Sequence, residues 1–86
     1  MKEIILWEVD TKIIRACELA IYDSLKSLGL KAFVTINSEV PLIARNQLWN
    51  RLPVLEIRGL QWSLHPGRPF TVEELTGLFS KVLIDQ

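Results

Sequence analysis

The chain has 86 residues, of which 49% are hydrophobic, and its ten basic residues balance its ten acidic ones. This length predicts a single domain, residues 1–86, and the balanced charge excludes the basic surface on which nucleic-acid binding depends. No segment approaches the ~18 continuous apolar residues of a membrane span, and the first residues lack the apolar stretch and cleavage site of a signal peptide. We therefore expect a soluble cytoplasmic protein that contacts no membrane and no nucleic acid.

The first third of the chain predicts a strand followed by a long amphipathic helix. The apolar run Ile-Ile-Leu-Trp at 4–7 is typical of a strand buried on both faces. Asp10 or Thr11 can cap a helix by accepting a hydrogen bond from a first-turn N–H. Apolar residues on one face of that helix recur every three or four positions: Ile14, Cys17, Ile21, Leu25 and Leu28. Gly29 then provides a typical helix stop.

A second predicted strand, 32–36, follows this helix. Its sequence, Ala-Phe-Val-Thr-Ile, is rich in β-branched and aromatic residues, and a strand–helix–strand unit of this length places its two strands parallel. Asn37 and Ser38 can cap a second helix, in whose first turn Pro41 is tolerated because the missing N–H would have no partner there. The apolar pattern after Pro41 is weak, which indicates a short or irregular helix.

The segment Leu52-Pro53-Val54-Leu55-Glu56-Ile57 predicts the start of a hairpin. Proline fits the first position of a strand because no ladder N–H is needed there. Arg58-Gly59 separates this run from a second apolar run, 60–64, as hairpin turns do. The composition of 65–69 is typical of a loop.

The last helix has the clearest predicted start. Thr71 and Glu74 match a capping box, in which each side chain bonds the backbone N–H of the other residue. Apolar residues then form one stripe: Val72, Leu75, Leu78, Phe79 and Val82. Gly77 lies inside this helix and weakens it by about 1 kcal/mol relative to alanine. Close packing against a neighbour is the explanation that we expect for this glycine.

In order and spacing, these elements resemble the small thioredoxin-like and glutaredoxin-like proteins, especially the compact redox-active disulfide type. In that group the first helix ends in Leu-Gly, as at Leu28-Gly29, and a later strand begins with a cis-proline, as at Pro53-Val54-Leu55. A Gly-Arg-x-Pro-like segment then enters a final helix with Glu-Glu, similar to 67–74 here. The resemblance implies an α/β, thioredoxin-like βαβαββα fold, which is a four-stranded mixed sheet with helices on both faces and a cis bond before Pro53. A ferredoxin-like βαββαβ order is the alternative, but it needs a final strand, whereas this chain ends in a predicted helix.

The resemblance also places the two cysteines of the C-x-x-C motif at about Thr11 and Ile14, where this chain has none. That chemistry needs a thiolate activated by the helix N-terminus and a second thiol that resolves the mixed disulfide. Glu8 and Asp10 would raise the pKa of any thiol placed there. Dithiol exchange is therefore not expected, no catalytic residue is assigned, and we expect no cofactor.

Cys17 and Pro53 each have two interpretations. Cys17, the only cysteine, is either a one-cysteine redox site or, as we predict, a small core residue on the helix stripe. Pro53 either exposes a backbone edge to an extended peptide or to glutathione, as the resemblance implies, or only organises the core. One cysteine and one histidine supply no metal ligand set.

His65 and Arg68 lie in the predicted loop. His65 could act as an acid–base group, and Arg68 could bind an anion such as a carboxylate. His65 has no carboxylate, serine or cysteine partner at motif spacing, so we expect both to be ordinary exposed loop residues. Three tryptophans are many for a chain of this size: Trp7, Trp49 and Trp62. Either all three pack in the core, or one is exposed at an interface, where tryptophan is enriched.

Together these features predict a non-redox thioredoxin-like domain that acts as a protein-binding or assembly module, with another protein or a second copy of itself as partner. The candidate cleft for a ligand or partner is formed by Asp10, Thr11, Ile14, Leu52 and Pro53. The alternative is a glutaredoxin-like thiol-disulfide oxidoreductase or a glutathione-binding protein that uses Cys17 or the Pro53 edge.

Overall fold

The computed structural model describes residues 2–84, which form an α/β structure around a four-stranded mixed sheet. Its elements in chain order are β1 (Lys2–Trp7), α1 (Thr11–Leu28), β2 (Ala32–Asn37), α2 (Val40–Arg45), the 3-10 turn η1 (Trp49–Arg51), β3 (Val54–Ile57), β4 (Leu60–Trp62), α3 (Val72–Phe79) and the π-helical turn η2 (Ser80–Ile84). The α/β class and the mixed four-stranded sheet predicted from the sequence are confirmed.

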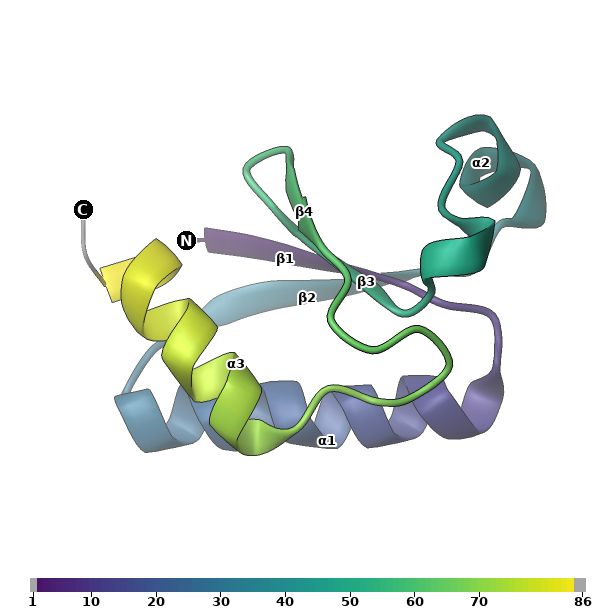
Figure 1. Cartoon of the computed structure of the whole chain (residues 1–86). Helices are drawn as coiled ribbons and strands as arrows, with labels where there is room; N and C mark the ends of the chain where they lie inside the picture. Colours follow the sequence, from purple (N-terminus) through teal and green to yellow (C-terminus); the bar gives the residue numbers. More distant parts are fainter. Residues whose placement is uncertain (1, 85–86) are drawn as a thin grey trace.

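Strand β1 has an interior position in the sheet, whose strand order is β2-β1-β3-β4 (Figure 1). It pairs in parallel with β2 and antiparallel with β3, and β3 pairs antiparallel with β4. The parallel pair follows from the crossover through α1, because the helix returns the chain to the end of the sheet where β1 began. Along β1, Ile4 and Leu6 are fully buried on one face of the sheet, and Trp7 is buried on the other.

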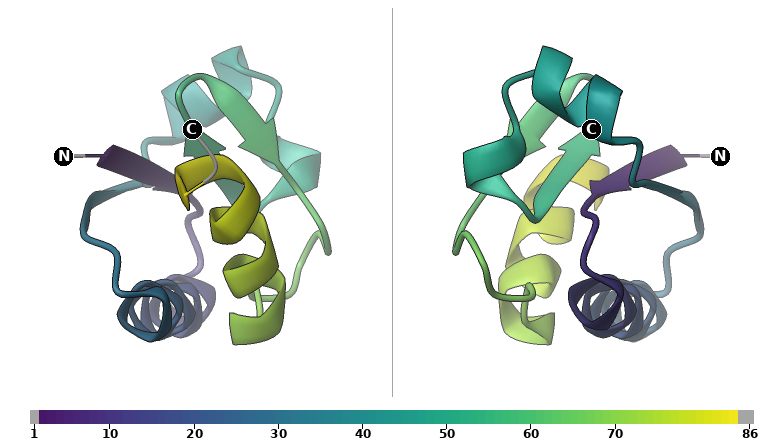
Figure 2. Two further views of the ribbon diagram at one scale, coloured as in Figure 1. Left: turned by 90° about the vertical axis from the view of Figure 1, so that its left-hand side faces the viewer. Right: turned by 90° about the vertical axis from the view of Figure 1, so that its right-hand side faces the viewer.

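Helices lie on both faces of the sheet. Figure 1 shows α1 and α3 below the sheet and α2 above one end of it, and the end-on views of Figure 2 show the same three layers. The buried residues of the larger core, between the sheet and α1 and α3, are Ile4, Leu6, Cys17, Ala20, Ile21, Leu25, Leu55, Ile57, Phe70, Leu75, Phe79 and Leu83. Those of the smaller core at α2 are Trp7, Ile43, Leu48, Leu52 and Val54. Because α2 has only six residues, it covers only part of its face of the sheet.

Short-range signals set the ends of α1 and α3. Asp10 is the N-cap of α1, and Gly29 ends that helix in the left-handed conformation with φ of 68°. Thr71 and Glu74 form the predicted capping box of α3. Gly77 is exposed, and a Cβ there would meet nothing within 4 Å. The expected close packing at this glycine is therefore wrong.

The predicted hairpin joins β3 to β4. Arg58 and Gly59 have φ of 54° and 79°, which is the pair of left-handed residues that a tight hairpin turn uses. β4 has three residues and ends at Trp62, so it is shorter than the apolar run 60–64. The Leu52–Pro53 peptide bond, just before β3, is cis.

Candidate functional site

The residues predicted to form a cleft come from two segments that differ in burial. Asp10 and Thr11 are exposed at the start of α1 and Ile14 is half-buried one turn later, whereas Leu52 and Pro53 are buried before β3. A hollow of about 180 Å³ adjoins the helix start, and its lining residues are Thr11, Lys12 and Arg15. Since neither Leu52 nor Pro53 lines this hollow, it belongs to the helix surface alone.

The backbone N–H groups at the start of α1 are bonded to the carboxylate of Asp10. The Asp10 side chain accepts hydrogen bonds from the backbone N–H groups of Lys12 at 2.9 Å and Ile13 at 3.2 Å. Unpaired N–H groups at a helix start are the groups that would stabilise a thiolate or a bound anion. Asp10 occupies two of them, and Thr11, the other predicted cap, is instead the first residue of the helix.

Glu8 is a buried carboxylate beside this helix start. Its exposed fraction is 3%. Oε2 accepts hydrogen bonds from the backbone N–H groups of Val9 at 2.9 Å and Asp10 at 3.1 Å, whereas Oε1 is buried without a partner in the described part of the chain. The sequence did not indicate this burial, because a charged residue after an apolar strand is equally typical of an exposed turn. The carboxylate holds the backbone where the chain turns from β1 into α1.

Cys17 is fully buried in the larger core, as predicted. Burial raises the pKa of its thiol above the ordinary value, the Phe70 backbone lowers it in part, and the charge of Glu8 raises it further. Because the thiolate is the nucleophile, a buried and protonated sulfur suits a core residue better than a redox site.

The backbone edge before Pro53 is occupied by the chain itself. The Leu52 carbonyl accepts a hydrogen bond from the Gly67 N–H at 2.8 Å, and both Pro53 and Val54 are fully buried. An extended peptide binds a strand through backbone groups of this kind. The loop 65–69 therefore covers the acceptor that a peptide or glutathione would need.

His65, expected to be an ordinary exposed loop residue, contacts a carboxylate that motif spacing did not indicate, and its side chain is 39% exposed. Its Nε2 lies at hydrogen-bond distance from Oε2 of Glu74, which is nine residues further along the chain. The hydrogen bond from the Thr71 backbone N–H lowers the pKa of Glu74 most, and the contact with His65 lowers it further. Arg68 is exposed, as expected. The histidine therefore ties the loop 65–69 to the start of α3.

The three tryptophans divide between core and surface. Trp7 is buried, and Trp62 is half-buried against the larger core. Trp49, in η1, is 52% exposed. One tryptophan is thus exposed, which is one of the two outcomes that the sequence left open.

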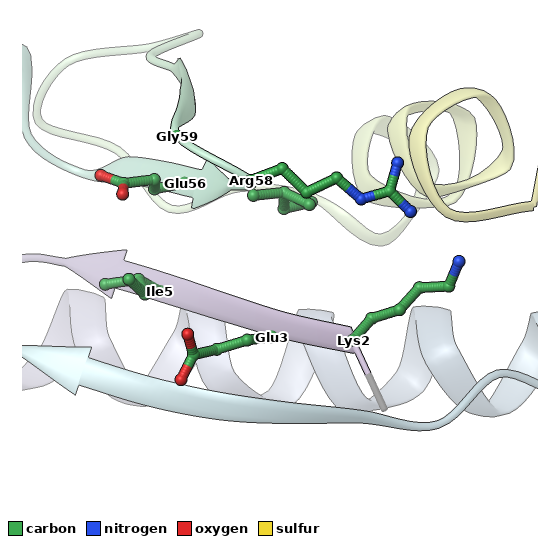
Figure 3. Close-up of a pocket in the computed structure, with 7 residues that line it drawn as sticks. Lys2, Glu3, Ile5, Glu56, Arg58 and Gly59 are labelled. Atoms are coloured by element: carbon green, nitrogen blue, oxygen red, sulfur yellow. The ribbon is translucent and has the colours of Figure 1, made fainter. Parts of the chain in front are cut away.

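The face of the sheet beside α2 carries a pocket of about 390 Å³ (Figure 3). Its lining residues are Lys2, Glu3, Ile5, Glu56, Ile57, Arg58 and Gly59. Figure 3 shows the side chains of Lys2 and Arg58 extending toward the same end of the pocket. The Glu56 carboxylate accepts hydrogen bonds from Trp7 Nε1 at 3.1 Å and Gln61 Nε2 at 3.0 Å. The lining has balanced charge, so it can hold a polar group, and it contains neither a thiol nor an imidazole.

Apolar side chains are exposed along the outer edge of β2. Phe33 on the strand is 62% exposed, and Tyr22 of α1, which lines the same hollow as Phe33, is 51% exposed. A second hollow lies between α1 and β2, has a volume of about 390 Å³ and is lined by Tyr22, Leu25, Lys26, Leu30, Lys31, Ala32 and Phe33. We call β2 together with Tyr22 the β2 edge surface. The sequence predicted the strand but not this surface, because the strand order decides which strands lie at an edge.

Comparisons of the chain with protein-family models, with curated proteins and with solved structures found no match. Among residues 2–84, no three His, Cys, Asp or Glu side chains are grouped as metal ligands would be. Within the same residues, no helix has both the length and the apolar character needed to cross a bilayer. The function is therefore argued from the geometry of this chain.

Proposed function

We propose that this chain is a thioredoxin-like domain without a redox centre, and that it acts as a protein-binding or assembly module through the β2 edge surface. The strand order β2-β1-β3-β4, the parallel β1–β2 pair and the placement of α1 and α3 on one face support the thioredoxin-like assignment. The cis bond before Pro53 is a further feature that the resembled group shares. Because a fold does not define a function, the binding role is argued from the surface.

The observation that carries the binding role is the unprotected edge of β2. Proteins usually shield an exposed edge strand with charges, proline, bulges or short length. β2 has six residues, none of them charged and none of them proline, in unbroken register with β1. Exposed aromatic side chains flank it at Phe33 and Tyr22, and such residues are enriched at interfaces. A partner strand would pair with the open backbone and cover these rings.

The oxidoreductase or glutathione-binding alternative has less support. A redox role needs a reactive thiol, but Cys17 is buried and its pKa is raised. A glutathione site needs an open backbone before Pro53, but the Leu52 carbonyl is bonded to Gly67. In an insulin-reduction assay we expect no turnover, and turnover that Cys17→Ser abolishes would overturn the proposed function.

The test of the binding role is site-specific photo-crosslinking in the cells that make the protein. A photoreactive phenylalanine analogue replaces Phe33, and the same analogue at Leu60 is the matched control. Leu60 is equally suitable because it is 60% exposed and lies on β4, at the opposite edge of the sheet. We expect covalent protein adducts from position 33 and not from position 60. No adduct from position 33, or equal yields from both positions, would overturn the proposed function.

A further inference from the structure

We infer that the occupant of the β2 edge surface is a second copy of this chain, joined by antiparallel pairing of the two β2 strands. The inference rests on the proposed function and names its partner. In the resulting dimer the two mixed sheets become one continuous sheet across a two-fold axis perpendicular to it. Three features of the chain favour this pairing: the free backbone of β2, the charges that flank it and the adjacent side of α1.

The open backbone groups of β2 belong to alternate residues. The Asn37 carbonyl accepts a hydrogen bond from the Glu8 N–H at 3.3 Å, so Asn37 directs its backbone groups toward the β1 side. Successive residues of a strand direct these groups to opposite sides. Val34 and Ile36 therefore direct their N–H and C=O groups outward, where the sheet has no further strand among the described residues.

Two charges that flank β2 select one register: Lys31 directly precedes the strand, and Glu39 follows it by two residues as the N-cap of α2. Residues directly opposite each other in an antiparallel pair lie on the same face of the sheet. A register centred on Thr35 pairs Val34 with the partner's Ile36, and it places Lys31 opposite the partner's Glu39. By symmetry this charge pair forms twice. Both Lys31 and Glu39 are exposed, and neither forms an ion pair within residues 2–84.

The neighbouring register is less favourable. If Val34 instead met the partner's Val34, Lys31 would face Asn37 and Glu39 would face Gly29 of the partner. Both charges would then lack a partner of opposite sign. The register centred on Thr35 also places two threonines face to face, which is a favourable cross-strand pair.

The side of α1 that adjoins β2 lies near the proposed axis. After a short connection from Leu28 to Ala32 the strand runs back along the helix, and Tyr22 lines the hollow between α1 and β2 together with Ala32 and Phe33. Tyr22 is 51% exposed. In the dimer Tyr22 would face the partner's α1 beneath the joined sheet and become buried.

Sedimentation equilibrium across micromolar concentrations tests the inference. We expect the wild type to show a monomer–dimer equilibrium. Thr35→Lys places two like charges at the axis and should weaken the dimer about tenfold or more. The matched control is Leu60→Lys, which adds the same charge on the opposite edge and should leave the dimer unchanged. Circular dichroism of each variant confirms that it is folded.

A charge exchange tests the register. Lys31→Glu and Glu39→Lys should each weaken the dimer about fivefold, because each places like charges opposite one another. The double variant restores both pairs and should bind within about twofold of the wild type. Additive weakening in the double variant would overturn the register and with it the inference.

The outcomes separate this inference from the proposed function. If the protein is strictly monomeric but position 33 still forms adducts with other proteins, the inference that the partner is a second copy is overturned, whereas the binding role remains. A dimer that Thr35→Lys does not weaken also overturns the inference, because the contact then lies elsewhere. A monomer without adducts from position 33 overturns both.

Discussion

The carbonyl oxygen of Leu52 and the backbone N–H of Gly67 form a hydrogen bond of 2.8 Å that closes the backbone before β3. Gly67 donates this bond from a left-handed conformation with φ of 86°, which glycine adopts without a steric penalty. His65, two residues earlier, contacts Glu74 at the start of α3. The loop is thus held at two points, and the Leu52 carbonyl is bonded within the chain itself.

Gly67→Ala should lower the free energy of unfolding by about 1 kcal/mol, because a residue with a Cβ is strained at this φ. Gly77→Ala is the matched control, since it adds the same methyl group inside α3 and should raise the free energy of unfolding by about 0.5–1 kcal/mol. A Cβ at either position would meet nothing within 4 Å, so backbone conformation alone separates the two. Urea unfolding measures both values, and a shift of the same sign in both variants would contradict the assignment.

Cys17 should react with a thiol reagent only when the protein unfolds, because the side chain is fully buried. Burial raises the pKa of this thiol, so the folded protein keeps a proton that the unfolded chain loses above about pH 8.5. The contribution of the Cys17 thiol to the free energy of unfolding is therefore fully present below that pH and should fall as the pH rises above it. Cys17→Ala should remove this part of the alkaline dependence. Rapid labelling of the native protein would show that the thiol is accessible.

Glu74→Ala should cost about 1 kcal/mol of stability at neutral pH, because it removes the oxygen that accepts the Thr71 N–H. Glu74→Gln keeps an acceptor there and should cost less. The bond to the Thr71 N–H and the contact with His65 lower the pKa of Glu74, so its contribution is present above the unfolded-state value of about 4.3 and is lost as the pH falls through the lower folded-state value. Thermal unfolding between neutral and acidic pH should show this loss in the wild type and not in Glu74→Gln. An equal acid dependence in both proteins would refute this account of Glu74.

The elements were predictable where the signals are local. The apolar run 4–7, the stripe from Ile14 to Leu28, the turn at Arg58-Gly59 and the capping box at Thr71 each depend on residues close together in sequence. Their order predicted one parallel pair from the strand–helix–strand unit and one antiparallel pair from the hairpin, and the resemblance to thioredoxin-like proteins implied the four-stranded mixed sheet.

The site was less predictable because its contacts join distant segments. The bond from Gly67 to Leu52 and the contact between His65 and Glu74 depend on the path of one loop, which no periodic pattern encodes. The burial of Glu8 depends on how the chain turns between β1 and α1. The exposure of Phe33 follows from the edge position of β2 and from the short α2, which leaves this part of its face of the sheet uncovered.

Amide hydrogen exchange at Val34 and Ile36 tests most directly the central claim that the β2 edge pairs with another strand. Their N–H groups point away from β1 and become bonded only when a partner strand is present, whereas those of Phe33 and Thr35 face β1 and are the internal controls. We predict that exchange at Val34 and Ile36 slows as the protein concentration rises, toward the rates of the two controls. The claim would be contradicted if both amides still exchanged fast at the highest protein concentration and also exchanged fast after addition of any partner identified by crosslinking at position 33.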